Sequence, residues 1–252
     1  MRGAWLEELT WPEAREWIES GRVIVIPVGA ISKEHGHHLP LNTDYLLARA
    51  FTQGVIEALA VLAAPVISAG YYPAFRHYPG SQHLDPTTFQ AVLEETMAGF
   101  IEQGAGNLAI INTGVSTEPV IRIAVREILE RHGVRVPVAD IRRLGKRTDA
   151  LFQQKLGGHG DEHETSLILA IKPEVVRPGR AQADYGNLLD APKTVFEVPA
   201  IFDPDPASGI DYSAAGIHGD PTLATVEKGR VVLEAIIQDL VEGLQALFPG
   251  VL

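Results

Sequence analysis

A continuous apolar run near the N-terminus constrains the fold more than any other feature of the sequence. Val23-Ile24-Val25-Ile26 consists of β-branched residues without polar alternation, and Pro27 and Gly29 end it. A strand that is apolar on both faces must be covered on both faces, as in a parallel sheet that lies between layers of helices. The run therefore predicts an internal strand of an α/β protein.

Helical and extended segments alternate along the rest of the chain. Before the first strand, Thr10 and Glu13 fit a capping box, and Gly21 ends that helix. Further helices are expected at 44–59, 86–102, 118–132, 161–171 and 220–247, and strands at 61–67, 108–111 and 136–139. Residues 177–215 lack periodicity and are expected to form loops and short strands. The alternation predicts one domain, 1–252, with a mainly parallel sheet and helices on both faces.

The composition excludes several classes of function. The chain has 32 acidic against 21 basic residues, and its net charge of -11 argues against a nucleic-acid partner. It has no cysteine, so any metal must be bound by His, Asp and Glu. It has no signal-peptide pattern and no apolar stretch of the roughly 20 residues that span a bilayer. We therefore expect a cytoplasmic protein without a membrane partner.

The densest group of candidate metal ligands follows the first strand. Residues 33–44 hold three histidines and two carboxylates, of which the candidate ligands are Glu34, His35 and Asp44. Imidazole and carboxylate suit Zn, Mn or Fe, and Gly36 lets the backbone turn so that neighbouring side chains converge. A solvated polar loop is the alternative, but it does not explain so many ligand-type residues directly after a buried strand. His38 is expected to face the substrate or to orient a ligand.

A second acidic and histidine-rich group lies at residues 159–166. A helix that begins near Asp161 has Glu162 in its first turn and His159 just outside it. Acidic residues at a helix N-terminus complement the helix dipole without any further function. His159 has no such explanation, and it is a candidate general acid or base because histidine titrates nearest neutral pH. The loops that carry Glu34 and Ser116 both follow strands, where ligands gather in parallel sheets.

Four separated segments, 34–44, 78–81, 159–166 and 219–229, resemble motifs of the creatininase (creatinine amidohydrolase) family. The first resembles its E-Q-H-G-P-H-L-P-L-x-T-D motif, and the third resembles its H-A-G-E-x-E-T-S motif. The second and fourth are similar to its F-P-G-T and G-D-P-x-x-A-T-x-E-K-G elements. Four motifs in the right order are far more specific than any one of them.

The resemblance implies a three-layer α/β fold, usually assembled as a hexamer, and a centre of one or two divalent ions that hydrolyses a small cyclic or linear amide. Zinc is expected first, with manganese or iron as alternatives. His35 is similar to a metal-binding histidine of the family, and Asp44 to the aspartate that bridges two ions. His159 is similar to the histidine that moves protons, and Glu162 is expected to assist it or to complete the metal shell.

Two positions depart from the family pattern. Lys33 stands where the family has a glutamate two residues before its first ligand histidine, so Glu34 is the candidate carboxylate. Gly114 stands in the place of a metal-binding histidine. Glu118 is a candidate substitute for it, with a plain capping role at the helix start as the alternative.

The predicted function is hydrolysis of a non-peptide C–N bond by metal-activated water, with His159 passing the proton to the leaving nitrogen. The predicted substrate-binding residues are Ser81, Ser116 and His38. The alternative is a non-catalytic protein that binds a small metabolite and has lost part of its metal centre at Lys33 and Gly114. Measuring whether the purified protein contains bound metal distinguishes the two hypotheses.

Overall fold

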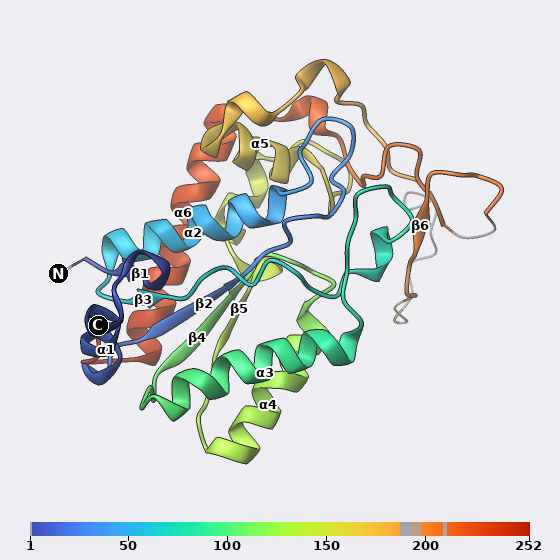
Figure 1. Ribbon diagram of the computed structural model, residues 1–252. Coiled ribbons are helices and arrows are strands. Elements are labelled where there is room, and N and C mark those ends of the chain that lie inside the picture. The colour runs from blue at the N-terminus through green and yellow to red at the C-terminus, as the bar shows by residue number, and fades with distance from the viewer. Residues whose placement is uncertain (1, 187–194, 196–197, 209–210) are drawn as a thin grey trace.

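A five-stranded parallel sheet forms the middle layer of the protein (Figure 1). The computed structural model describes the whole chain except residues 1, 187–194, 196–197 and 209–210. In their order across the sheet, the strands are β1 (Ala4–Trp5), β3 (Leu62–Ala63), β2 (Ile24–Val28), β4 (Leu108–Asn112) and β5 (Val138–Asp140). A separate two-stranded sheet pairs β6 (Phe202–Asp203) with β7 (Asp211–Tyr212).

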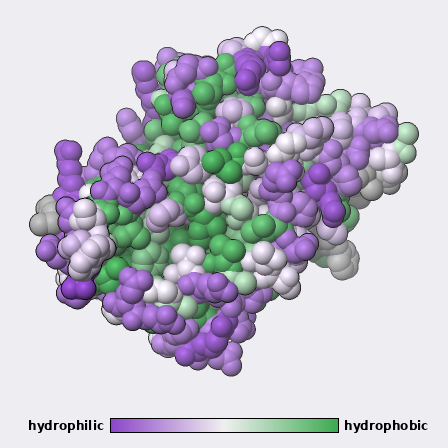
Figure 2. Space-filling view, in the orientation of Figure 1, coloured by the Kyte–Doolittle hydropathy of each residue, from purple (hydrophilic) through white to green (hydrophobic). Residues whose placement is uncertain are grey.

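Helices cover both faces of the sheet. One layer contains α2 (Thr43–Ala58), α5 (Glu162–Ile171) and α6 (Val226–Leu247), and the other contains α1 (Trp11–Glu19), α3 (Pro86–Glu102) and α4 (Glu118–His132). Figure 2 shows hydrophobic residues gathered across the middle of the visible face, between the two helical layers. The three-layer α/β fold with a mainly parallel sheet is therefore confirmed. None of the described helices is long and apolar enough to cross a membrane.

The position of β2 between two hydrophobic cores explains why its sequence is apolar throughout. Val25 packs into the hydrophobic core under α2, α5 and α6, whereas Ile24 and Ile26 pack into the core under α3 and α4. All five residues of β2 are buried. Burial of an aliphatic side chain of this size contributes about 1.5–3 kcal/mol, so the strand holds the two helical layers together.

The ends of several elements differ from the sequence prediction. The capping box of α1 is present, since the amide of Thr10 donates to Glu13 Oε2 at 2.7 Å. The strand predicted at 61–67 is interrupted, because Pro65 has no N–H to donate to a neighbouring strand. β3 ends at Ala63, and pairing resumes only as an isolated bridge between Ile67 and Val28. The helix predicted from Asp220 begins instead at Val226, after a short 3-10 turn. β1 is too short to give a sequence pattern.

The strand order brings the predicted site loops together. β2 and β4 are neighbours in the sheet, and their last residues, Val28 and Asn112, are paired. The loops that contain Glu34 and Ser116 therefore leave from the same edge, as predicted. An isolated antiparallel bridge between His159 and His218 joins the turn before α5 to the segment that precedes α6.

Candidate metal centre

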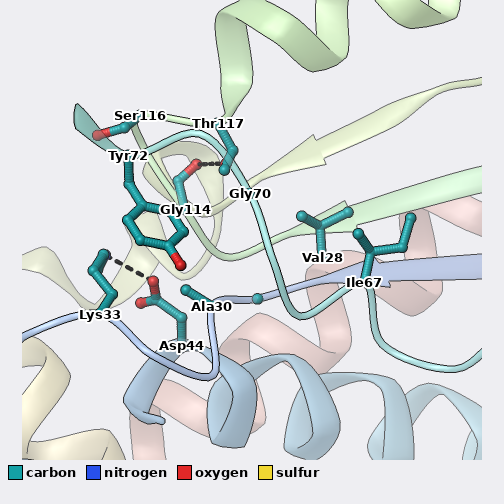
Figure 3. Close-up of a pocket in the computed structure, with 11 residues that line it drawn as sticks. Val28, Ala30, Lys33, Asp44, Ile67, Gly70, Tyr72, Gly114, Ser116 and Thr117 are labelled. Carbon is teal, nitrogen blue, oxygen red and sulfur yellow. Dashed lines mark hydrogen bonds and ion pairs between the residues drawn. The ribbon is translucent and has the colours of Figure 1, made fainter. Parts of the chain in front are cut away.

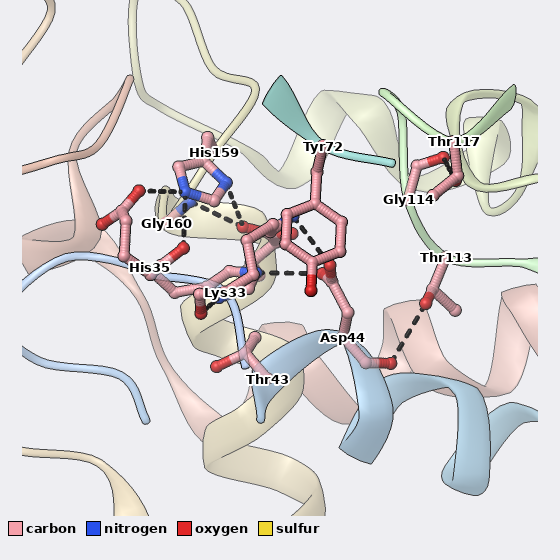
Figure 4. Close-up of polar contacts among 12 residues, drawn as sticks. Lys33, His35, Thr43, Asp44, Tyr72, Thr113, Gly114, Thr117, His159 and Gly160 are labelled. Atoms are coloured by element: carbon pink, nitrogen blue, oxygen red, sulfur yellow. Dashed lines mark hydrogen bonds and ion pairs between the residues drawn. The ribbon is translucent and has the colours of Figure 1, made fainter. Parts of the chain in front are cut away.

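His35, His159 and Glu164 form the candidate metal centre. One ligand-type atom of each lies within 4.8 Å of the others, and no other trio of this kind occurs among the residues that the structure describes. Both histidines are buried, whereas Glu164 is partly exposed. The loop after β2 carries His35, and the start of α5 and the turn before it carry the other two. The fold thus joins the two sequence clusters into one site (Figure 4).

The hydrogen bonds of His35 direct one ring nitrogen toward a carboxylate. Its Nδ1 lies 2.9 Å from the backbone carbonyl of Lys33, which can only accept, so Nδ1 carries a proton. Its Nε2 lies 2.9 Å from Asp44 Oδ1, also an acceptor. Burial lowers the pKa of His35, but attraction to Asp44 outweighs it, and the pKa is raised. A cation, either a proton or a metal ion, belongs between Nε2 and Oδ1.

His159 is held in the form that can bind a metal through Nδ1. Its Nε2 lies 2.9 Å from the backbone carbonyl of Glu34 and 2.7 Å from Glu34 Oε1, so Nε2 carries the proton. The unprotonated Nδ1 faces Glu164 Oε2 at 3.9 Å. Burial, followed by repulsion from Lys33, sets the pKa of His159 well below its usual value and keeps the ring neutral. The Phe75 ring stacks on it with 3.8 Å between centroids.

Lys33 places a buried ammonium beside the trio. Its Nζ lies 2.7 Å from Asp44 Oδ2, and both side chains are almost completely buried (Figure 4). Burial lowers the pKa of Lys33, but Asp44 and Glu164 outweigh it, so the pKa is raised. Burial raises the pKa of Asp44, but Lys33 and His35 outweigh it, so the pKa is lowered. Both groups of this pair are therefore charged.

Two carboxyl groups at the centre, that of Glu164 in the trio and that of Glu34 behind His159, have raised pKa values. Burial raises the pKa of both Glu34 and Glu164 to about 7. The amide of Gly36 donates to Glu34 Oε2 at 2.8 Å, and the amide of Gly160 donates to Glu164 Oε2 at 2.6 Å. The trio itself places two imidazoles and one carboxylate around one point, and this donor set fits a divalent ion.

The predicted site residues Glu162 and Glu118 are not brought to the trio. Glu162 is fully buried, and its carboxylate accepts from Lys228 Nζ at 2.5 Å and from the amides of Gln153 and Gln154 at 2.9 and 2.8 Å. Glu118 is paired with two arginines, Arg122 and Arg142. Each carboxylate is therefore held by groups outside the trio.

Sequence reasoning missed Glu164: of the acidic residues in the first turn of this helix it chose only Glu162 for the site, and the helix dipole was explanation enough for Glu164. Residues two positions apart on an α-helix point in nearly opposite directions. Since Glu162 points to Lys228 on α6, Glu164 points the other way, to the histidines. Which of the two glutamates faces the histidines depends on how α5 packs on α6, and the sequence does not reveal that packing.

Two of the three predicted substrate-binding residues serve the loops instead of lining a cavity. Ser81 Oγ accepts from the amide of Glu34 at 3.1 Å, and His38 Nε2 lies 2.8 Å from Thr165 Oγ1. Both are buried, and burial lowers the pKa of His38 to about 4. Ser116 lies in the wall of the main pocket.

Two cavities meet the centre at different places. A pocket of about 570 Å³ reaches His159 and Glu164, a volume that suits a small molecule. A second cavity of about 10 Å³, roughly the space of one water molecule, lies beside Lys33 and Asp44 (Figure 3). Gly114 and Tyr72 help to line this smaller cavity.

Comparison with known proteins decides the family. The model of the family Creatininase, described as creatinine amidohydrolase, matches residues 7–244. The chain belongs to the creatininase family. It is 28% identical over 267 residues to creatinine amidohydrolase from Pseudomonas putida, with 98% of each chain covered. It is 27% identical over 274 residues to 3-dehydro-scyllo-inosose hydrolase from Thermotoga maritima, covering 98% of this chain and 86% of the relative.

Solved structures of the family agree with the fold. A mutant creatininase of Zn-Zn type matches with a TM-score of 0.80 and 27% identity, covering 99% of this chain and 100% of that one. The family membership predicted from the four motifs is confirmed. The predicted metal-dependent hydrolase agrees with the family, and the alternative of a non-catalytic binding protein is not favoured.

Proposed function

We propose that this creatininase-family protein is a metal-dependent amidohydrolase that cleaves a non-peptide C–N bond of a small cyclic or linear amide. The observation that carries the proposal is the trio of His35, His159 and Glu164, two of which line the main pocket. The amidohydrolase relative supports the reaction class. The volume of the pocket, about 570 Å³, supports a small substrate.

The trio would hold one divalent ion, which we propose to be zinc, with manganese or iron as alternatives. Two imidazoles and one carboxylate are a known ligand set of catalytic zinc sites. Such an ion, when bound, lowers the pKa of a bound water toward neutrality and polarises the carbonyl of the amide.

Acceptor oxygens behind the two histidines orient them. Glu34 accepts the Nε2 proton of His159, which fixes the tautomer and directs Nδ1 toward Glu164. For His35, the backbone carbonyl of Lys33 accepts the Nδ1 proton and leaves Nε2, beside Asp44 Oδ1, to bind an ion. Phe75 covers the ring of His159 and keeps water from one of its faces. Ser116 belongs to the pocket wall that we propose to contact the substrate.

His159 has two roles to distinguish. The sequence predicts a proton carrier, whereas its place in the trio supports a metal ligand. Measuring metal content separates them: we expect His159→Ala to lose metal as well as turnover. A variant that keeps its full metal content and loses only turnover would support the proton-carrier role.

An amide and formamide panel, assayed after chelation and after zinc is added back, tests the function. We expect His35→Ala to abolish both hydrolysis and zinc uptake, while His132→Ala, a change at an exposed histidine of α4, leaves both intact. Failure of the zinc-loaded protein to hydrolyse any member of the panel, or hydrolysis that a chelator does not reduce, would overturn the proposal.

The proposal also includes a cytoplasmic location and a homo-oligomer, which is a hexamer by resemblance to the family. Light scattering on the purified protein tests the oligomeric state, with a monomer as the contrary result. Limited proteolysis tests whether residues 1–252 behave as one domain.

A further inference from the structure

The ammonium of Lys33 is an unusual neighbour for a metal centre. Only 7% of the residue is exposed, and its Nζ lies 2.7 Å from Asp44 Oδ2 and 5.7 Å from the centroid of the Phe75 ring. Lysine is almost never fully buried unless an anion compensates its charge. Here the anion is a carboxylate that also faces a candidate metal ligand, His35.

The two carboxylate oxygens of Asp44 face different neighbours. Its Oδ1 faces His35 and the trio, whereas its Oδ2 faces Lys33. Figure 4 shows His35 and His159 on one side of Asp44, and Gly114 and Thr117 on the other. The two oxygens of one carboxylate therefore serve two separate places for a positive charge.

The small cavity beside Lys33 and Asp44 lacks the donors that a metal ion needs. The small cavity there is lined by Gly114, Ser116 and Tyr72, among others, and Asp44 is the one carboxylate in its lining. No histidine lines it (Figure 3). Asp44 Oδ2 is buried and has no hydrogen-bond donor in good geometry, so the ion contact with Lys33 is what compensates it.

We propose that the ammonium of Lys33 is a built-in cation that takes the place of a second metal ion, so that the centre holds at most one divalent ion. This inference rests on the proposed function, because it concerns the same centre. With all three carboxyl groups ionised around a bound ion, the charges of Glu34, Asp44 and Glu164 are balanced by one ammonium and one divalent ion. A second divalent ion would leave excess positive charge in a buried site, which is costly. The chain differs in this respect from the solved relative of Zn-Zn type.

The number of zinc ions per chain tests the inference. Wild-type protein, Lys33→Glu and the exposed control Lys172→Met are purified in zinc, desalted and measured by mass spectrometry of the metal. We expect one zinc per chain in the wild type and in the control, and two in Lys33→Glu, where a carboxylate replaces the ammonium. Two zinc ions in the wild type, or no gain in Lys33→Glu, would overturn the inference.

A second variant covers the case in which Lys33→Glu does not fold. Lys33→Met removes the charge and keeps the length of the side chain. By isothermal titration of the chelator-treated protein, we expect it to bind zinc at least tenfold more tightly than the wild type, because a repelling charge is gone and Asp44 is uncompensated. An unchanged zinc affinity would count against a cationic role for Lys33.

The outcomes also separate this inference from the proposed function. If the wild type takes up no zinc but Lys33→Glu takes up one ion, the amidohydrolase proposal fails and the role of Lys33 as a substitute cation stands. If the wild type takes up two ions and hydrolyses an amide, the function stands and the inference fails. If neither protein takes up zinc, both fail.

Discussion

Replacing Lys228 with methionine should destabilise the protein without touching the candidate metal centre. Lys228 Nζ contacts Glu162 Oε1 at 2.5 Å and ties the start of α6 to the start of α5. The side chain of Glu162 is 0% exposed, so the change leaves a buried carboxylate without its cation. Breaking a buried ion pair in this way typically costs about 3–5 kcal/mol.

The structure reduces that cost here. Glu162 keeps two backbone donors, the amides of Gln153 and Gln154, and Lys228 is partly exposed. We therefore expect a loss of about 2–3 kcal/mol. For a chain of this size the loss corresponds to a fall in Tm of roughly 4–12 °C.

Thermal unfolding followed by circular dichroism measures this effect on chelator-treated protein. Lys172→Met is the matched control, because Lys172 is exposed, and its Tm should stay close to that of the wild type. Glu162→Gln should lower the Tm as well and should retain zinc. A change in Tm below about 1 °C in Lys228→Met would refute the reasoning. Loss of zinc from Glu162→Gln at an unchanged Tm would indicate that Glu162 is a metal ligand after all.

Three other predictions follow from single contacts. Burial lowers the pKa of His38 from 6.5 to about 4. The folded protein is therefore most stable above pH 6.5, where His38 is neutral in both the folded and the unfolded state, and it loses stability as the pH falls toward 4. His38→Gln should remove at most about 3 kcal/mol of this pH dependence in urea unfolding between those limits, and an identical pH profile would contradict it. Ser81→Ala removes the acceptor for the amide of Glu34 and should cost about 1 kcal/mol in urea unfolding, whereas no loss would mean that water replaces the hydroxyl. Phe75→Ala uncovers the ring of His159 and should raise its pKa toward the usual value, as measured by NMR titration; an unmoved pKa would show that Phe75 contributes little to its burial.

The order and type of the main elements could be predicted because their patterns are local. The apolar run at 23–26 became the buried strand β2, and the capping box of Thr10 and Glu13 formed as expected. The start of α6 was misplaced because Asp220-Pro221 is a good start for a helix and equally for a 3-10 turn. In the structure Thr225 caps the helix, since its side chain accepts from the amide of Lys228 at 3.2 Å.

The site was harder to predict because it depends on which way side chains point. His35, His159 and Asp44 could be chosen from residue type and spacing, and the fold brings all three together. Glu162 and Glu164 could not be told apart, because the helix face that each occupies is set by how α5 packs on α6. Lys33 stood out in the sequence as a departure, but its pairing with Asp44 needs the three-dimensional position of both.

The pairing of Lys33 with Asp44 also bears on the order in which the protein matures. A buried carboxylate that relied on a metal for its compensating charge would make folding wait for the metal. Here the compensating charge is part of the chain, so the core around Asp44 can pack without a metal ion, whatever the local supply of metal. A divalent ion could then be taken up after folding, through the pocket that reaches His159 and Glu164.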